Sequence, residues 1–137
     1  MNKFADIDLK SLVFGAAIAA ACIIFGYQFS DWLYPFAAVG LLYTGYGQSS
    51  IKMGTLMGAV ASTPIIVLTF QGYLGTFSGF FVTETGILTV AVVVLLVGAF
   101  VGFVGAWAKR DRIKALEEYE KKQNIGKNKK KNKAKNK

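Results

Sequence analysis

Histidine is absent from this chain, and cysteine occurs only once, at Cys22. A single cysteine excludes an internal disulfide and a cysteine-based zinc site. Paired carboxylates suited to acid–base catalysis are also missing, and the glycines lie in apolar runs instead of in phosphate-binding or dinucleotide-binding patterns. We therefore predict that the protein is not an enzyme and uses no metal or other cofactor.

Charge is scarce in the middle of the chain. Within residues 11–108, only Asp31, Lys52 and Glu84 are charged. A soluble domain needs charged side chains spread along its sequence to cover its surface, so this pattern argues against that class. Apolar runs of about 18 residues or more are typical of membrane-spanning helices. The sequence therefore predicts an all-α integral membrane protein, located in the cell membrane.

The last uncharged run before the basic end of the chain comprises residues 85–108. At about 1.5 Å per residue, a helix of this length crosses a hydrocarbon layer of roughly 30 Å. Helix is the expected form because every backbone N–H and C=O in lipid must be bonded inside the segment. Basic residues follow at once, beginning with Lys109 and Arg110, and such a positive flank predicts that this end lies in the cytoplasm.

Three further uncharged runs precede it, and together the four runs predict a bundle of four spans. The expected spans are about residues 11–30, 32–47, 53–71 and 86–108. Asp8 is a candidate N-cap for the first. A short polar loop that begins at Gly45 is expected to follow the second span. Pro64 is expected to kink the third span by freeing a backbone carbonyl, and Ser62 or Thr63 could partly offset the lost hydrogen bond. Residues 72–83 are either a loop or a half-buried interfacial segment.

The three isolated charges are consistent with four spans. If the C-terminus is cytoplasmic, residues 1–10 are cytoplasmic too, Asp31 and Glu84 lie in outer loops, and Lys52 lies in the inner loop. Every Lys and Arg then lies on the cytoplasmic side, as the positive-inside rule requires.

Basic charge is concentrated after residue 108. Residues 109–137 contain 13 Lys/Arg and 4 Asp/Glu, a net charge of +9. Residues 109–122 are expected to extend the last helix into the cytoplasm, and the low-complexity residues 123–137 are expected to be disordered. This Lys-rich tail either fixes topology as a solvated segment, binds anionic lipid headgroups or contacts nucleic acid without specificity. The predicted headgroup contacts are Lys109, Arg110, Arg112, Lys114, Lys127, Lys129, Lys130 and Lys131.

Small residues recur at helical spacing in three of the predicted spans. The stripes are Gly15, Ala19 and Cys22 in the first span; Gly54, Gly58 and Ser62 in the third; and Gly98, Gly102 and Ala106 in the fourth. Such faces, of which GxxxG is the best known, let two helix backbones approach closely in lipid. Two interpretations remain open: the stripes pack inside one bundle, or they join several chains into an oligomer. A lipoprotein signal ending at Cys22 is disfavoured because the apolar run continues to Phe29.

Two segments carry a resemblance to a known family. Residues 45–62, GYGQSSIKMGTLMGAVAS, and 98–112, GAFVGFVGAWAKRDR, resemble the uncharacterised glycine-rich four-span membrane proteins of methanogenic archaea. The resemblance covers residues 11–112 at most. It implies a four-span fold and a membrane location but no activity, because the function of that family is unknown. Small multidrug transporters differ, since their first span carries a mid-membrane Glu where residues 16–24 are uncharged here.

No ionisable residue lies in the middle of a predicted span, which is where transport chemistry usually needs one. We therefore expect a non-catalytic accessory or structural membrane component of unknown molecular function. The alternative is an oligomeric pore former, resembling phage holins, or a small-solute channel. Its expected partners are the lipid bilayer, anionic headgroups and either further copies of itself or a larger membrane complex; specific binding to nucleic acid is not expected.

Overall fold

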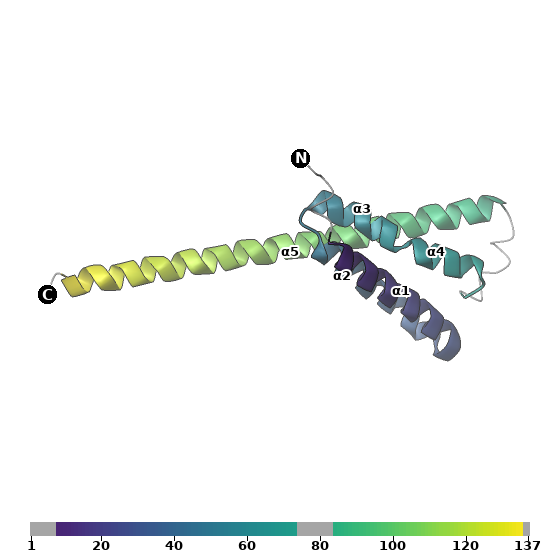
Figure 1. The fold of residues 1–137 in the computed structure, drawn as a ribbon, viewed down its shortest axis with the longest axis horizontal. Helices are drawn as coiled ribbons and strands as arrows, with labels where there is room; N and C mark the ends of the chain where they lie inside the picture. Colours follow the sequence, from purple (N-terminus) through teal and green to yellow (C-terminus); the bar gives the residue numbers. More distant parts are fainter. Residues whose placement is uncertain (1–7, 74–83, 136–137) are drawn as a thin grey trace. The chain divides into compact units, whose positions relative to one another are not determined.

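The described part of the chain is almost entirely helical. A computed structural model describes residues 8–73 and 84–135, with side chains for 8–73 and 85–123, and no strand occurs in these ranges (Figure 1). Three helices are long and apolar enough to cross a membrane: Leu9–Phe29, Ile51–Phe70 and Thr85–Gln123. The chain divides into two units, Met1–Trp107 and Ala108–Lys137, which are described separately below.

Helix α1 (Leu9–Phe29) begins at the predicted N-cap. The Asp8 carboxylate accepts hydrogen bonds from the backbone N–H groups of Lys10 at 3.2 Å and Ser11 at 3.4 Å. These groups have no partner inside the helix, so the cap satisfies donors that would otherwise be orphaned. The prediction for Asp8 is confirmed, and the helix ends where Ser30 turns to an extended conformation.

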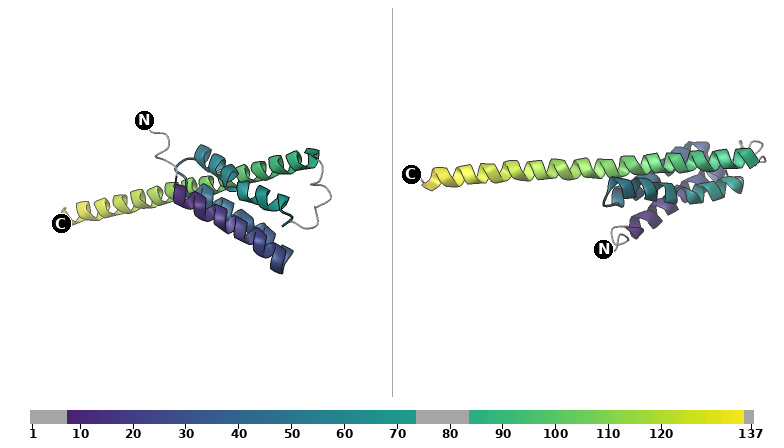
Figure 2. Two further views of the ribbon diagram at one scale, coloured as in Figure 1. Left: turned by 45° about the vertical axis from the view of Figure 1, so that its right-hand side comes forward. Right: turned by 90° about the horizontal axis from the view of Figure 1, so that it is seen from above.

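The second predicted span consists of two elements. A 3₁₀ helix, η1 (Asp31–Phe36), leads into α2 (Ala37–Gly47). Pro35 lies inside η1, and tight 3₁₀ turns are common at helix starts, where a residue without an N–H is tolerated. Helix α2 ends at residue 47, the end given for the predicted span, but Gly45 does not break the helix as the sequence pattern led us to expect. Helices α1 and α2 lie side by side (Figure 2, left).

The third predicted span is interrupted once. Helix α3 (Ile51–Ala61) is capped by the hydroxyl of Ser50, and α4 (Thr63–Phe70) follows after Ser62. Pro64 lies in the first turn of α4, so the helix breaks just before the residue that cannot donate a backbone hydrogen bond. The Ser62 hydroxyl donates to the carbonyl of Ala59 at 2.7 Å and so satisfies one acceptor at this break.

Helix α5 (Glu84–Lys135) runs through both units. Its residues 109–122 are helical, and the helix continues to Lys135, whereas the sequence predicted disorder from residue 123. Extending an existing helix needs no new nucleus, and Lys and Ala are good helix formers, which accounts for the difference. Most of the segment 72–83, predicted as loop or interfacial, lies outside the described residues.

The core of the first unit is built from small and medium apolar side chains. Its buried members are Ala19, Ile23, Ala37, Leu41, Ala61 and Ile65. Large apolar side chains lie outside instead: Phe29 is 74% exposed, Leu88 68% and Phe100 67%. A soluble monomer rarely exposes apolar patches larger than a few hundred Å², so this exterior is the one expected of a protein surrounded by lipid.

Candidate functional site: a glycine crossing and two polar ends

The six small residues of the stripes in the third and fourth predicted spans meet at one interface within the first unit, which we call the glycine crossing. A Cβ atom placed on Gly58 would lie 2.7 Å from the Cα of Gly102, and one placed on Gly98 would lie 2.6 Å from the hydroxyl oxygen of Ser62. A Cβ on Gly54 would overlap the methyl group of Ala106. The pairs are therefore 54 with 106, 58 with 102 and 62 with 98, an antiparallel register that advances four residues at each step.

Helix α2 joins the same crossing. A Cβ on Gly45 would lie 2.7 Å from the Cα of Gly102, and one on Gly105 would lie 2.9 Å from the backbone nitrogen of Tyr46. Gly102 thus lies where α2, α3 and α5 meet. The sequence pattern indicated that Gly45 breaks the helix, and Gly105 does not follow the four-residue spacing of Gly98 and Gly102. Neither residue was therefore predicted as a contact residue.

The first stripe packs against α2. A Cβ on Gly40 would lie 2.8 Å from the backbone nitrogen of Ala19, and one on Gly15 would overlap the carbonyl oxygen of Gly40. Ala19 is fully buried, while Cys22 is half-buried beside the core. Gly15 and Gly40 therefore let α1 and α2 touch backbone to backbone.

A buried polar cluster joins the start of α1 to the end of α2. The Gln48 side chain is 1% exposed, the Thr44 side chain is fully buried, and Ser11 is 3% exposed. The Gln48 amide nitrogen donates to the Ser11 hydroxyl at 3.1 Å and to the Asp8 carbonyl at 3.3 Å, and the amide oxygen accepts the Asp8 N–H at 3.2 Å. No local sequence pattern predicts this cluster, because Gln48 was expected in a loop and its partners Asp8 and Ser11 lie about 40 positions away.

Most hydroxyl groups in the described apolar region donate to a backbone carbonyl three or four residues earlier in the chain: Thr44 to Gly40 at 3.1 Å, Thr55 to Ile51 at 3.0 Å, Ser62 to Ala59 at 2.7 Å, Thr69 to Ile65 at 2.7 Å and Thr89 to Thr85 at 2.7 Å. The Thr44 hydroxyl also lies 3.4 Å from the carbonyl oxygen of Ser11 and so links α2 to α1. Among the described residues, no buried side-chain nitrogen or oxygen lacks a hydrogen-bond partner.

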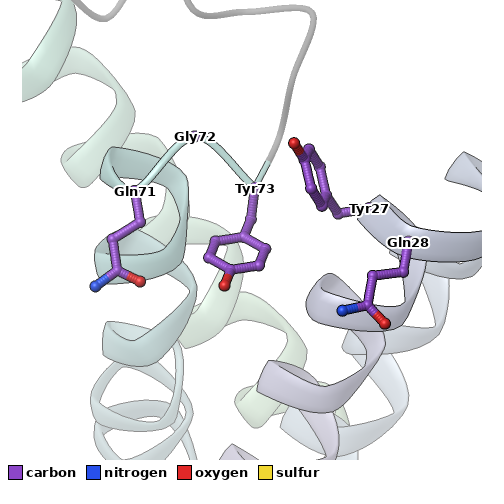
Figure 3. Close-up of a pocket in the computed structure, with 5 residues that line it drawn as sticks. All are labelled: Tyr27, Gln28, Gln71, Gly72 and Tyr73. Carbon is purple, nitrogen blue, oxygen red and sulfur yellow. The ribbon is translucent and has the colours of Figure 1, made fainter.

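A partly open cavity of about 260 Å³ lies between the C-terminal ends of α1 and α4 (Figure 3). Its lining residues are Tyr27, Gln28, Gln71, Gly72 and Tyr73. Tyr27 and Tyr73 meet edge to face with ring centroids 5.3 Å apart. The Tyr34 hydroxyl donates to the Tyr73 carbonyl at 3.0 Å and ties this end of α4 to η1.

The basic residues predicted to contact lipid headgroups lie in the second unit. The side chains of Arg110, Arg112 and Lys114 are exposed and Lys109 is half-buried. The side chains of Lys127, Lys129, Lys130 and Lys131 lie outside the described set. Within the part of the chain whose side chains are described, no group of three or more metal-ligating side chains occurs.

No family model matches this chain, and neither a curated protein nor a solved structure matches it. The resemblance to archaeal four-span proteins therefore stays a prediction, and function has to be argued from the geometry of the chain itself.

Proposed function

We propose that the chain is a four-span membrane protein with both termini in the cytoplasm, acting as a non-catalytic structural or accessory component of the membrane. Three helices already have the length and hydropathy of spans. The arrangement of η1 and α2 supports a fourth span, and the glycine crossing supports the structural role.

Support for the fourth span comes from contacts at both ends of α1. Gln48, just after α2, is bonded to Asp8 at the start of α1. At the opposite end, a Cβ on Gly26 would lie 2.5 Å from the ring of Tyr34 in η1. The segment from η1 to the end of α2 thus accompanies α1 along its length. Six residues rising about 2.0 Å and eleven rising about 1.5 Å give about 28 Å, close to the thickness of the hydrocarbon layer.

The proposed orientation follows from the even number of spans and the distribution of charge. Lys52 then shares the cytoplasmic side with the residues from Lys109 onward, and Asp31 lies outside, in agreement with the positive-inside rule. We propose further that the exposed basic residues after Trp107 contact anionic headgroups, each near-surface Lys or Arg contributing about 1 kcal/mol.

The structural role is supported by one observation: the small-residue faces pack against helices of the same chain. A neighbouring helix covers each of the glycines Gly45, Gly54, Gly58, Gly98 and Gly102. An oligomeric pore would need such a face, or a polar one, on the outside. The exterior consists instead of large apolar side chains, and the hydroxyls of Thr55 and Thr69 are bonded within their own helices. This arrangement favours a closed bundle that offers its surface to lipid or to larger membrane partners.

The test compares two readouts of the full-length chain in its native membrane. Chemical crosslinking followed by purification should recover the protein with larger membrane proteins, while a potential-sensitive dye should report an unchanged membrane potential on overexpression. Dissipation of the potential would instead support the pore former. Recovery as a monomer alone, without partners, would contradict the accessory role.

A further inference from the structure

We propose that the cavity between the ends of α1 and α4 binds one uncharged, hydroxyl-rich ring, a single sugar unit, at the outer face of the membrane. None of its lining residues, Tyr27, Gln28, Gln71, Gly72 and Tyr73, is charged at neutral pH. An ionic ligand would find no counter-charge there. A purely apolar ligand would displace water from the amide groups of Gln28 and Gln71 without replacing its hydrogen bonds, which is costly.

Two glutamine amides supply the hydrogen-bonding groups. Gln28 and Gln71 are exposed, and within the described part of the chain neither side chain makes a hydrogen bond. Each amide offers two donors and one acceptor oxygen, which matches sugar hydroxyls that both donate and accept. Figure 3 shows both side chains directed to the same side, with the Tyr73 ring between them. Gln48 is the contrast, because its amide is used within the fold.

Aromatic rings supply the walls. The edge-to-face contact between Tyr27 and Tyr73 and the bond from Tyr34 to the Tyr73 carbonyl fix the ring of Tyr73 at the cavity. Gly72 makes the turn that carries Tyr73 there, with a φ of 87° that side chains rarely adopt. The face of a tyrosine ring suits the C–H face of a sugar, and its hydroxyl remains available to polar groups at the membrane surface.

The volume and the position of the cavity limit the ligands that it can bind. The cavity of about 260 Å³ is smaller than the roughly 300–1,000 Å³ of typical ligand pockets, so it accommodates one ring and not an oligosaccharide. It lies at the same end of the helices as Asp31, the end proposed above to face outward. A sugar at that surface is either the headgroup of a glycolipid or a soluble saccharide, and both present the same hydroxyl chemistry.

The experiment is NMR of the full chain in phosphatidylcholine nanodiscs, with ¹⁵N-labelled glutamine side chains. The probes are methyl β-glucoside in solution and glucosyl-diacylglycerol in the disc. We expect the amide signals of Gln28 and Gln71 to shift, while that of Gln123, which is exposed in the second unit, stays unchanged. A shift with the lipid alone identifies a headgroup, and a shift with the soluble probe identifies a free saccharide.

A variant separates binding from general perturbation. Gln71→Ala should weaken binding about fivefold, the loss expected for one neutral hydrogen bond, and Gln123→Ala should not. The buried Gln48 amide signal reports that each variant remains folded. Absence of any shift with either probe, an equal shift at Gln123, or unchanged binding by folded Gln71→Ala would each overturn the proposal, and none of these outcomes bears on the structural role proposed above.

Discussion

Gly58 and Gly102 lie against each other at the crossing of α3 and α5, so that a Cβ on either residue would come within 2.7 Å or 2.8 Å of the other's Cα. No side chain fits between the two backbones. Helices in lipid gain little from the hydrophobic effect and depend on such close packing. The free energy of unfolding should therefore be most sensitive to added bulk at these two positions.

The first prediction concerns this contact. Gly58→Leu and Gly102→Leu should each lower the melting temperature in detergent, because overpacking costs about 1–3 kcal/mol or more where a backbone must move. Val67→Leu and Val93→Leu are matched controls, since these valines are 50% and 51% exposed. Thermal unfolding followed by circular dichroism makes the comparison. Equal effects at all four positions would mean that the crossing does not hold the bundle together.

The second prediction concerns the polar cluster at the start of α1. Gln48→Leu removes the group that bonds Asp8 and Ser11 and leaves buried polar atoms unsatisfied, which should cost about 1–3 kcal/mol. Gln123→Leu changes an exposed glutamine in the same way and serves as the control. The same thermal measurement applies, and a Gln48→Leu variant as stable as the parent chain would show that the cluster contributes nothing.

The third prediction concerns topology. In a Cys22→Ala background, Asp31→Cys should react with a membrane-impermeant maleimide added to intact cells, and so should Glu84→Cys. Lys52→Cys should react only after permeabilisation, because four spans place it inside. Labelling of position 52 from outside would contradict the model with both termini in the cytoplasm.

The fourth prediction concerns the basic residues at the end of the chain. Deleting residues 123–137 should leave insertion intact, because the positive flank that begins at Lys109 remains. Binding of the protein to anionic vesicles should fall, most strongly at low salt, where charges are least screened. Vesicle sedimentation at two salt concentrations measures this effect. Loss of membrane insertion would show that the segment helps to place the last helix.

Some contacts were predictable because they follow from local spacing. Small residues four positions apart make a flat helix face, so Gly54, Gly58, Gly98 and Gly102 stand out in the sequence as contact residues. Gly45 did not, because a glycine near the end of an apolar run usually signals the end of the helix. Here it lies two residues before the end of α2 and makes the third contact at Gly102.

Other features depend on residues that are distant in sequence. Nothing near Gln48 indicates that its amide will be buried against Asp8, since the two lie 40 positions apart. The same holds for the cavity, where Gln28 and Gln71 approach only because α1 and α4 end at the same level. Helix in residues 123–135 was missed for a different reason: composition alone indicated disorder, and the preceding helix supplied the nucleus.

The position of Gly102 also has a consequence for biosynthesis. Its partners Gly45, Gly54 and Gly58 are made first, and α5 leaves the ribosome after them. Until it arrives, the glycine faces of α2 and α3 are open to lipid, where any helix with a small-residue face can bind them. A chain truncated before α5 should therefore be the form most readily captured by membrane chaperones and proteases. Once α5 is complete, it covers the glycine faces of α2 and α3.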